Sequence, residues 1–231
     1  MDSAAEVVIE VPTAAGQGRL TVAAAAQPRA LLWIGHGAGG GIGAADLVAL
    51  ASELPSTGIT VARYEQPWRV AGRRVASRAP ALDAAWLETA PAVDELAGGL
   101  PVIVGGRSAG ARVACRTAGA TGAAAVLCLA FPLHPPGRPD ASRLDELLTP
   151  TVPTLVLQGD RDTFGGAELL RAAVEAAPGD RASLRVVTVP GADHGMKTLK
   201  SSPFGARDVR ELIVATTSAF IDDVLSAPTS R

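Results

Sequence analysis

Short apolar runs alternate with amphipathic segments along most of the 231-residue chain. The runs are uninterruptedly apolar, as expected of strands that are covered on both faces, and the segments between them carry apolar residues at helical spacing. This alternation predicts a mostly parallel, twisted sheet with helices on both faces. The expected strands cover residues 30–34, 60–64, 102–104, 124–130, 154–157 and 184–189. The expected helices cover residues 44–54, 80–96, 109–118, 144–148 and 167–177, with a last one carrying apolar positions from 209 to 224.

The first part of the chain has a different pattern. Two β-type runs, residues 7–11 and 20–22, flank a glycine-containing turn at 14–18, which predicts an antiparallel hairpin. With this hairpin, the sheet is expected to have about seven or eight strands. Nothing resembles an interdomain linker, so residues 1–231 are expected to form one α/β domain. The short connection 133–143 leaves no room for a cap domain.

Composition narrows the classes of partner and compartment. The chain is 48% apolar with a formal net charge of -2, which argues against a nucleic-acid or membrane-surface partner. No apolar run reaches the roughly 18 residues of a membrane span, and the acidic start does not resemble a signal peptide. Cys115 and Cys128 lie in segments that are predicted to be buried, so a reducing, cytoplasmic location is expected. The sequence leaves open whether the protein is a monomer or a homodimer.

One pentapeptide carries candidate chemistry. Residues 106–110 read Gly-Arg-Ser-Ala-Gly, directly after the strand expected at 102–104 and at the start of a predicted helix. A G-x-S-x-G sequence in a sharp strand-to-helix turn exposes the serine Oγ as a nucleophile, and the flanking glycines leave room for that turn. Ser108 is therefore the candidate nucleophile.

The chain has three histidines that could serve as its base. On a fold of this kind the partners follow the serine in the order acid, then histidine. His36 precedes Ser108, and few plausible acids separate Ser108 from His134. His194 lies in a glycine-flanked loop after the last expected strand, so it is the candidate base.

The acid is expected after the strand at 154–157, where two aspartates compete. Asp162 lies farther from the strand end and can turn back toward the histidine loop, whereas Asp160 is suited to capping the turn. Asp162 is therefore the candidate acid. Asp193, next to His194, is expected to be structural.

A developing oxyanion needs N–H donors. The N–H of Ala109, at the start of a helix, is the first candidate, and the glycine-rich loop 36–40 is expected to provide the second through Ala38. Gly35-x-Gly37-x-x-Gly40 also satisfies a dinucleotide-binding pattern, with Glu65 placed to bind a ribose. The hydrolase interpretation is preferred because it also accounts for Ser108, Asp162 and His194.

An arginine-rich segment, residues 63–78, allows two interpretations. It is either a solvated loop or a site that attracts an anionic substrate or partner. Arg107 is of a kind that more often forms a buried ion pair than a substrate contact. The candidate substrate-binding residues are His36, Gly37, Gly39, Trp68, Arg69 and Arg107.

Four motifs together resemble the α/β-hydrolase superfamily. They are His-Gly-Ala-Gly-Gly at 36–40, Gly-Arg-Ser-Ala-Gly at 106–110, Phe-Pro-Leu-His-Pro-Pro-Gly at 131–137 and Gly-Asp-Arg-Asp-Thr-Phe-Gly at 159–165. The chain resembles a small lid-less branch near the dienelactone hydrolases, which is also similar to a testis-expressed hydrolase-like protein and to a domain of a chromatin acetyltransferase subunit. The resemblance implies the α/β-hydrolase fold and a serine hydrolase. Dienelactone hydrolases use a cysteine where this chain has Ser108, so their substrate does not transfer.

These observations predict a carboxylesterase-like serine hydrolase that cleaves small esters through an acyl-enzyme on Ser108. No metal or cofactor is expected. Two alternatives share the same residues: a hydrolase-shaped binding module with little turnover, and a cofactor-free perhydrolase or haloperoxidase.

Overall fold

The computed structural model describes residues 6–227 and contains one eight-stranded sheet. Its strands are β1 (Val7–Thr13), β2 (Gly16–Ala23), β3 (Ala30–Gly35), β4 (Ile59–Glu65), β5 (Val102–Arg107), β6 (Ala125–Leu129), β7 (Thr154–Gly159) and β8 (Leu184–Val189). The helices are α1 (Ala45–Glu53), α2 (Pro67–Val70), α3 (Ala79–Ala97), α4 (Ala109–Thr117), α5 (Leu144–Leu147), α6 (Ala167–Ala176) and α7 (Ala206–Ser226), with a 3₁₀ turn at Leu54–Thr57.

The strands lie in the order β1-β2-β4-β3-β5-β6-β7-β8. β1 and β2 form the predicted antiparallel hairpin, β2 also pairs antiparallel with β4, and the remaining strands are parallel. The chain leaves β3 toward β4 on one side and returns to β5 on the other side. In open α/β sheets, such a reversal creates a crevice at the carboxyl ends of the strands, where ligands bind.

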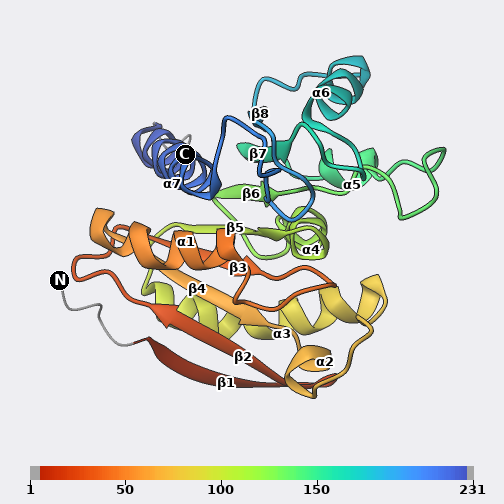
Figure 1. The fold of residues 1–231 in the computed structure, drawn as a ribbon. Coiled ribbons are helices and arrows are strands. Elements are labelled where there is room, and N and C mark those ends of the chain that lie inside the picture. The colour runs from red at the N-terminus through yellow and green to blue at the C-terminus, as the bar shows by residue number, and fades with distance from the viewer. Residues whose placement is uncertain (1–5, 228–231) are drawn as a thin grey trace.

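Helices cover both faces of the sheet, as the alternating pattern predicts (Figure 1). On one face, Leu50 of α1 and Ile213 and Phe220 of α7 pack on the sheet. On the other face, Trp86 of α3 and Val113 of α4 are buried in a core that also includes α5 and α6. Within residues 6–227 no cap domain interrupts the fold, because only the short helix α5 stands between β6 and β7.

The backbones of β3 and α4 approach each other closely, and this contact fixes where α4 begins. A Cβ added at Gly110, in the first turn of α4, would lie 2.5 Å from the carbonyl oxygen of Gly35 at the end of β3. No real Cβ atom tolerates that separation. Only a glycine therefore lets α4 begin directly against β3.

Two details of the fold differ from the sequence prediction. Residues 67–70 form helix α2 rather than loop, because Pro67 occupies its first position, where the missing N–H and fixed φ favour a helix. Arg63 does not belong to a solvated loop: it lies inside β4, is 6% exposed, and its Nη2 is 2.5 Å from Glu6 Oε1. β4 extends one residue beyond the expected strand at its carboxyl end, since pairing with β2 continues to Glu65.

No helix of the described chain has both the length and the apolar character that a membrane-spanning helix requires.

The contact between Gly110 and Gly35 gives a test of the fold. We expect Gly110→Ala to lower the free energy of unfolding by about 1–3 kcal/mol, because the added methyl group meets backbone that cannot move aside. Gly119→Ala is the matched control, since a Cβ there meets nothing within 4 Å. The control is expected to change stability by no more than about 0.5 kcal/mol. Urea denaturation measures both, and equal effects would contradict the account.

Candidate active site

Ser108 lies in the turn between β5 and α4, with φ 54° and ψ -109°. A positive φ is rare for a residue with a side chain and is sustained only when the surrounding structure holds it. Here the Ser108 N–H donates to Leu129 O at 2.9 Å, and Gly110 allows α4 to begin at once. The predicted strand-to-helix turn is present, and it points the Ser108 side chain toward the loop that follows β8.

A chain of hydrogen bonds connects three residues that follow three different strands. His194 Nε2 is 2.9 Å from Ser108 Oγ, and His194 Nδ1 is 2.8 Å from Asp162 Oδ2. The carboxylate can only accept, so the proton on His194 belongs on Nδ1 and the Nε2 lone pair faces Ser108. In this arrangement the imidazole can take a proton from the serine hydroxyl.

Further contacts hold Asp162 and His194 in this orientation. Asp162 has a fully buried side chain; Gln158 Nε2 lies 3.0 Å from its Oδ2, and the Phe164 N–H donates to its Oδ1 at 2.8 Å. The ring of Phe164 stands edge-on to the His194 imidazole, with the centroids 4.4 Å apart. Asp162 and His194 are therefore fixed by packing as well as by their mutual hydrogen bond.

The competing residues are used elsewhere. Asp160 Oδ2 accepts the N–H of Gly191 at 3.1 Å, so it ties two loops together. Asp193 turns away from the imidazole and accepts the N–H groups of Gly195 and Lys197. His134 Nδ1 faces the carbonyl oxygen of Ala141 at 2.8 Å.

The two expected oxyanion donors lie on the same side of the site. Ala38 and Ala109 both line a pocket beside Ser108. Neither of their N–H groups donates a hydrogen bond to another group within residues 6–227. Free N–H groups at the start of a helix and in a tight loop can stabilise negative charge that develops nearby.

The loop of residues 36–44 does not have the shape of a nucleotide-binding turn. In that motif the last glycine opens directly into a helix, whose N-terminus binds the pyrophosphate. Here α1 begins only at Ala45, after a further bend. A Cβ at Gly37 would lie 3.4 Å from Ser108 Cβ, so the loop packs against the nucleophile turn instead.

His36 is buried and both of its ring nitrogens are occupied. Nδ1 is 2.8 Å from Gly37 O, and Nε2 accepts the N–H of Gln66 at 3.1 Å, which makes the imidazole neutral with its proton on Nδ1. Burial lowers the pKa of His36. His36 is a predicted substrate-binding residue; in the structure it lines the pocket beside Ala38 and Ala109 and also connects the glycine loop to the segment after β4.

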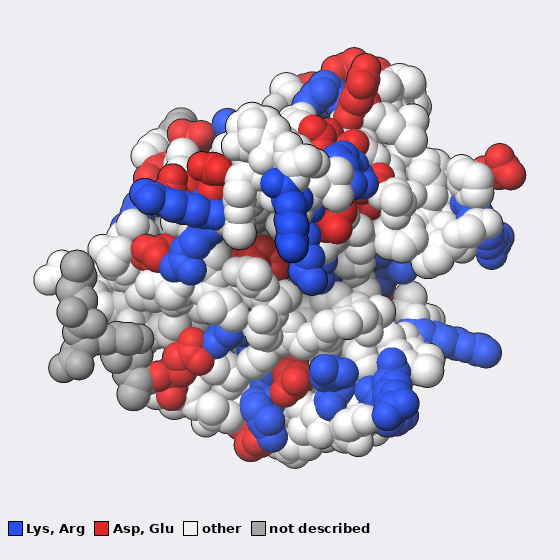
Figure 2. Space-filling model, viewed as in Figure 1, with Lys and Arg blue, Asp and Glu red and all other residues white. Residues whose placement is uncertain are grey.

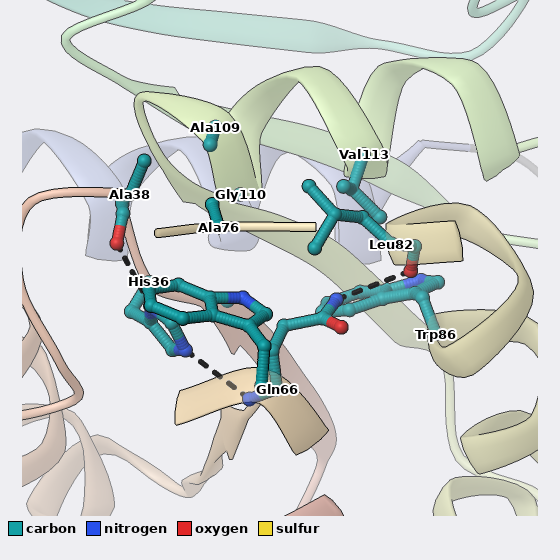
Figure 3. A pocket seen from close by; sticks show the side chains of 12 residues that line it. His36, Ala38, Gln66, Ala76, Leu82, Trp86, Ala109, Gly110 and Val113 are labelled. Carbon is teal, nitrogen blue, oxygen red and sulfur yellow. Dashed lines mark hydrogen bonds between the residues drawn. The ribbon is translucent and has the colours of Figure 1, made fainter. Parts of the chain in front are cut away.

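The pocket beside Ala38 and Ala109 is small and mostly apolar (Figure 3). Its enclosed space has room for about one water molecule. Leu82 and Trp86 from α3 and Val113 from α4 line it, together with Trp68 from α2. The remaining lining residues are Gly35, His36, Gly37, Gln66, Ala76 and Gly110.

The other predicted substrate contacts are dispersed. Trp68 lines the pocket, whereas Arg69 is exposed beside it, and a Cβ at Gly39 would meet nothing within 4 Å. Arg107 is 14% exposed and lies 3.1 Å from Asp46. Basic side chains gather over α2 and the segment that follows it, where Arg73, Arg74 and Arg78 are also exposed (Figure 2).

A comparison of the sequence with known protein families identifies the family of this chain. Residues 28–222 match the family described as "Alpha/beta hydrolase domain". The chain belongs to the alpha/beta hydrolase family. None of the curated proteins compared with the sequence matches this hydrolase domain.

Solved structures show the same fold at low sequence identity. XC6422 from Xanthomonas campestris, described as a serine hydrolase without a lid, is 19% identical, with 97% of each chain covered and a TM-score of 0.74. Est1E from Butyrivibrio proteoclasticus is 14% identical, with 95% of this chain and 99% of that chain covered and a TM-score of 0.74. A dienelactone hydrolase from Anabaena variabilis is 16% identical, with 94% of this chain and 97% of that chain covered and a TM-score of 0.72. These likenesses confirm the predicted lid-less α/β-hydrolase fold.

Three residues of the hydrolase site escaped the sequence analysis. Gln158 is hydrogen-bonded to Asp162, and Phe164 packs on His194. Gln158 could have been noticed in the sequence, because it is a polar residue within the apolar run of β7. The third, Asp46, has a buried side chain in the first turn of α1. No periodicity distinguishes it from an ordinary helix-start acid. Among the described residues, no group of three or more His, Cys, Asp or Glu side chains could hold a metal.

The lowered pKa of His36 predicts how stability depends on pH. The unfolded chain binds a proton at His36 near the ordinary histidine pKa of about 6.5, whereas the folded chain resists it. Stability is therefore fully present above that pH and is lost as the pH falls below it, with a slope of at most about 1.4 kcal/mol per pH unit from this group.

We expect His36→Asn to flatten the fall in unfolding free energy between about pH 7 and pH 5. NMR titration of the His36 ring should give a midpoint below that of a histidine peptide. A midpoint at or above the peptide value would contradict the assignment of a buried, neutral imidazole.

Proposed function

We propose that this alpha/beta hydrolase cleaves small carboxylic esters through an acyl-enzyme on Ser108. The observation that carries the proposal is the hydrogen-bonded series Ser108–His194–Asp162, in which each residue follows a different strand. The free N–H groups of Ala38 and Ala109 support it, because ester cleavage needs donors for the oxyanion as well as a nucleophile.

The proposed reaction uses these residues in turn. Ser108 Oγ attacks the ester carbonyl carbon while His194 Nε2 takes the hydroxyl proton, and the N–H groups of Ala38 and Ala109 bind the oxyanion. Collapse of the tetrahedral intermediate breaks the bond to the alcohol, which leaves with the proton from His194. A water molecule then attacks the acyl group, gives its proton to His194, and releases the acid as Ser108 recovers its own proton.

The size of the pocket supports small acyl groups. It adjoins both candidate oxyanion donors, so the acyl part of a bound ester would enter it. Its enclosed space is small, and two of its walls, Trp86 and Leu82, belong to the packed core. The proposal therefore favours acetyl esters over esters of longer acids.

The proposal is tested with a panel of p-nitrophenyl esters. We expect Ser108→Ala to lower kcat by at least about 10³-fold, since removal of a nucleophile leaves only the weak contribution of the oxyanion donors and binding. Ser201→Ala, at an exposed serine outside the site, is the control and should retain the wild-type rate. Wild-type protein that hydrolyses none of the esters would favour a binding module with the shape of a hydrolase.

The pocket gives a second test, of chain-length preference. Leu82→Ala removes a lining side chain, and we expect the ratio of kcat/KM for hexanoate to kcat/KM for acetate to rise on the order of tenfold. Leu87→Ala, on the same helix but 37% exposed, is the matched control and should leave the ratio unchanged. An unchanged ratio in Leu82→Ala would show that the acyl group lies elsewhere.

A further inference from the structure

A buried carboxylate and a partly buried guanidinium next to the candidate active site have no part in the proposed reaction. Arg107 ends β5, directly before Ser108, and its side chain is 14% exposed. Asp46 lies in the first turn of α1 with a side chain 2% exposed. Charged side chains are seldom buried this deeply unless they are paired, so their placement calls for an explanation.

The Arg107 guanidinium makes contacts with two other parts of the site and lies near a third. Its Nε is 3.1 Å from Asp46 Oδ2, and its Nη2 donates to the main-chain oxygen of His194 at 2.5 Å. Its Nη1 lies beside the glycine loop, 3.9 Å from where a Cβ of Gly37 would be. One planar group therefore spans α1, the histidine loop and the loop that carries Ala38.

The main chain of His194 needs such a support. It lies between β8 and α7, in residues 190–205, which contain no helix or strand. The turn is closed locally, since the Asp193 N–H donates to Lys197 O and the Met196 N–H donates to Asp193 O. These bonds shape the turn but do not attach it to the end of β5, which directly precedes Ser108. The bond from Arg107 makes that attachment at the histidine itself.

Asp46 orients the guanidinium in turn. Burial raises the pKa of Asp46, and the neighbouring Arg107 opposes that rise. Asp46 Oδ1 also accepts the N–H of Leu47 at 3.0 Å, so α1 holds the carboxylate firmly. The ion pair with Asp46 holds one end of the guanidinium, while Nη2 donates to the His194 carbonyl and Nη1 lies beside the glycine loop.

We propose that Arg107 is a positioning residue, which sets the distance between His194 and Ser108 by holding the His194 carbonyl, and that Asp46 holds Arg107 for this task. The catalytic part of this inference rests on the proposed function. The geometric part does not, because it concerns where His194 lies.

The test compares Arg107→Lys and Asp46→Asn with the wild-type protein. A lysine keeps the charge but cannot bind Asp46 and the His194 carbonyl as a fork. We expect Arg107→Lys to lower kcat for p-nitrophenyl acetate by on the order of 10–100-fold with KM changed less than about threefold, since a displaced catalytic group affects turnover more than binding. Asp46→Asn should lower kcat in the same way but by less.

The matched control is Arg116→Lys. Arg116 is also partly buried, at 19% exposed, and it pairs with Asp83 and Glu146 away from Ser108. Arg116→Lys should lose about as much stability as Arg107→Lys but keep the wild-type kcat. The inference is overturned if kcat falls equally in the control, if it stays within twofold in Arg107→Lys, or if only KM for acidic esters rises, which would make Arg107 a substrate ligand.

Crystal structures of the two variants separate this inference from the proposed function. We expect the distance between His194 Nε2 and Ser108 Oγ to exceed about 3.5 Å in Arg107→Lys, so that the hydrogen bond is lost. An inactive wild-type protein with this displacement would disprove the proposed function and leave the positioning role intact. A variant with the wild-type distance would disprove the positioning role, whatever the activity.

Discussion

The close approach between the end of β3 and the first turn of α4 is the constraint on which the site depends. Because Gly110 has no Cβ, α4 can begin immediately beside Gly35. The chain between β5 and α4 must then turn within one residue, and Ser108 takes the positive φ that this requires. The same contact brings the loop after β3 against the serine. The positions of the nucleophile and of both candidate oxyanion donors therefore depend on this one contact.

The sheet, rather than contacts among the site's own side chains, positions most of the candidate site. Asp162 and Ser108 come directly from strand ends and inherit their positions from the sheet. His194 does not, since it lies in a long irregular segment. Its ring is fixed by Asp162 and Phe164, and its main chain is held by Arg107. In the proposed function, the histidine is therefore the member most sensitive to distant substitutions.

Much of the fold could be predicted from the sequence because most of the parallel strands are largely apolar and the long helices carry apolar residues at helical spacing. The motif at 106–110 and the chain order of Ser108, Asp162 and His194 were predicted for the same reason: local turns at strand ends have recognisable sequences. The choice of Asp162 over Asp160 was also made from the sequence, and in the structure it is Asp162 that faces His194.

What could not be predicted depends on contacts between distant segments. The ion pair of Arg63 with Glu6 joins β4 to the segment that precedes β1, and no pattern within either segment encodes it. Helix α2 is too short for periodicity to detect. The burial of Asp46 beside Arg107 depends on how α1 packs near β5, and no pattern within either segment encodes it.

The most direct test of the central claim is labelling by a fluorophosphonate, which reacts with a serine only when a neighbouring base activates it. The account predicts one adduct on the folded protein, mapped by mass spectrometry to Ser108. It also predicts that labelling is lost in urea and in His194→Ala. Folded protein that remains unlabelled, or that carries its adduct on another serine, would contradict the account.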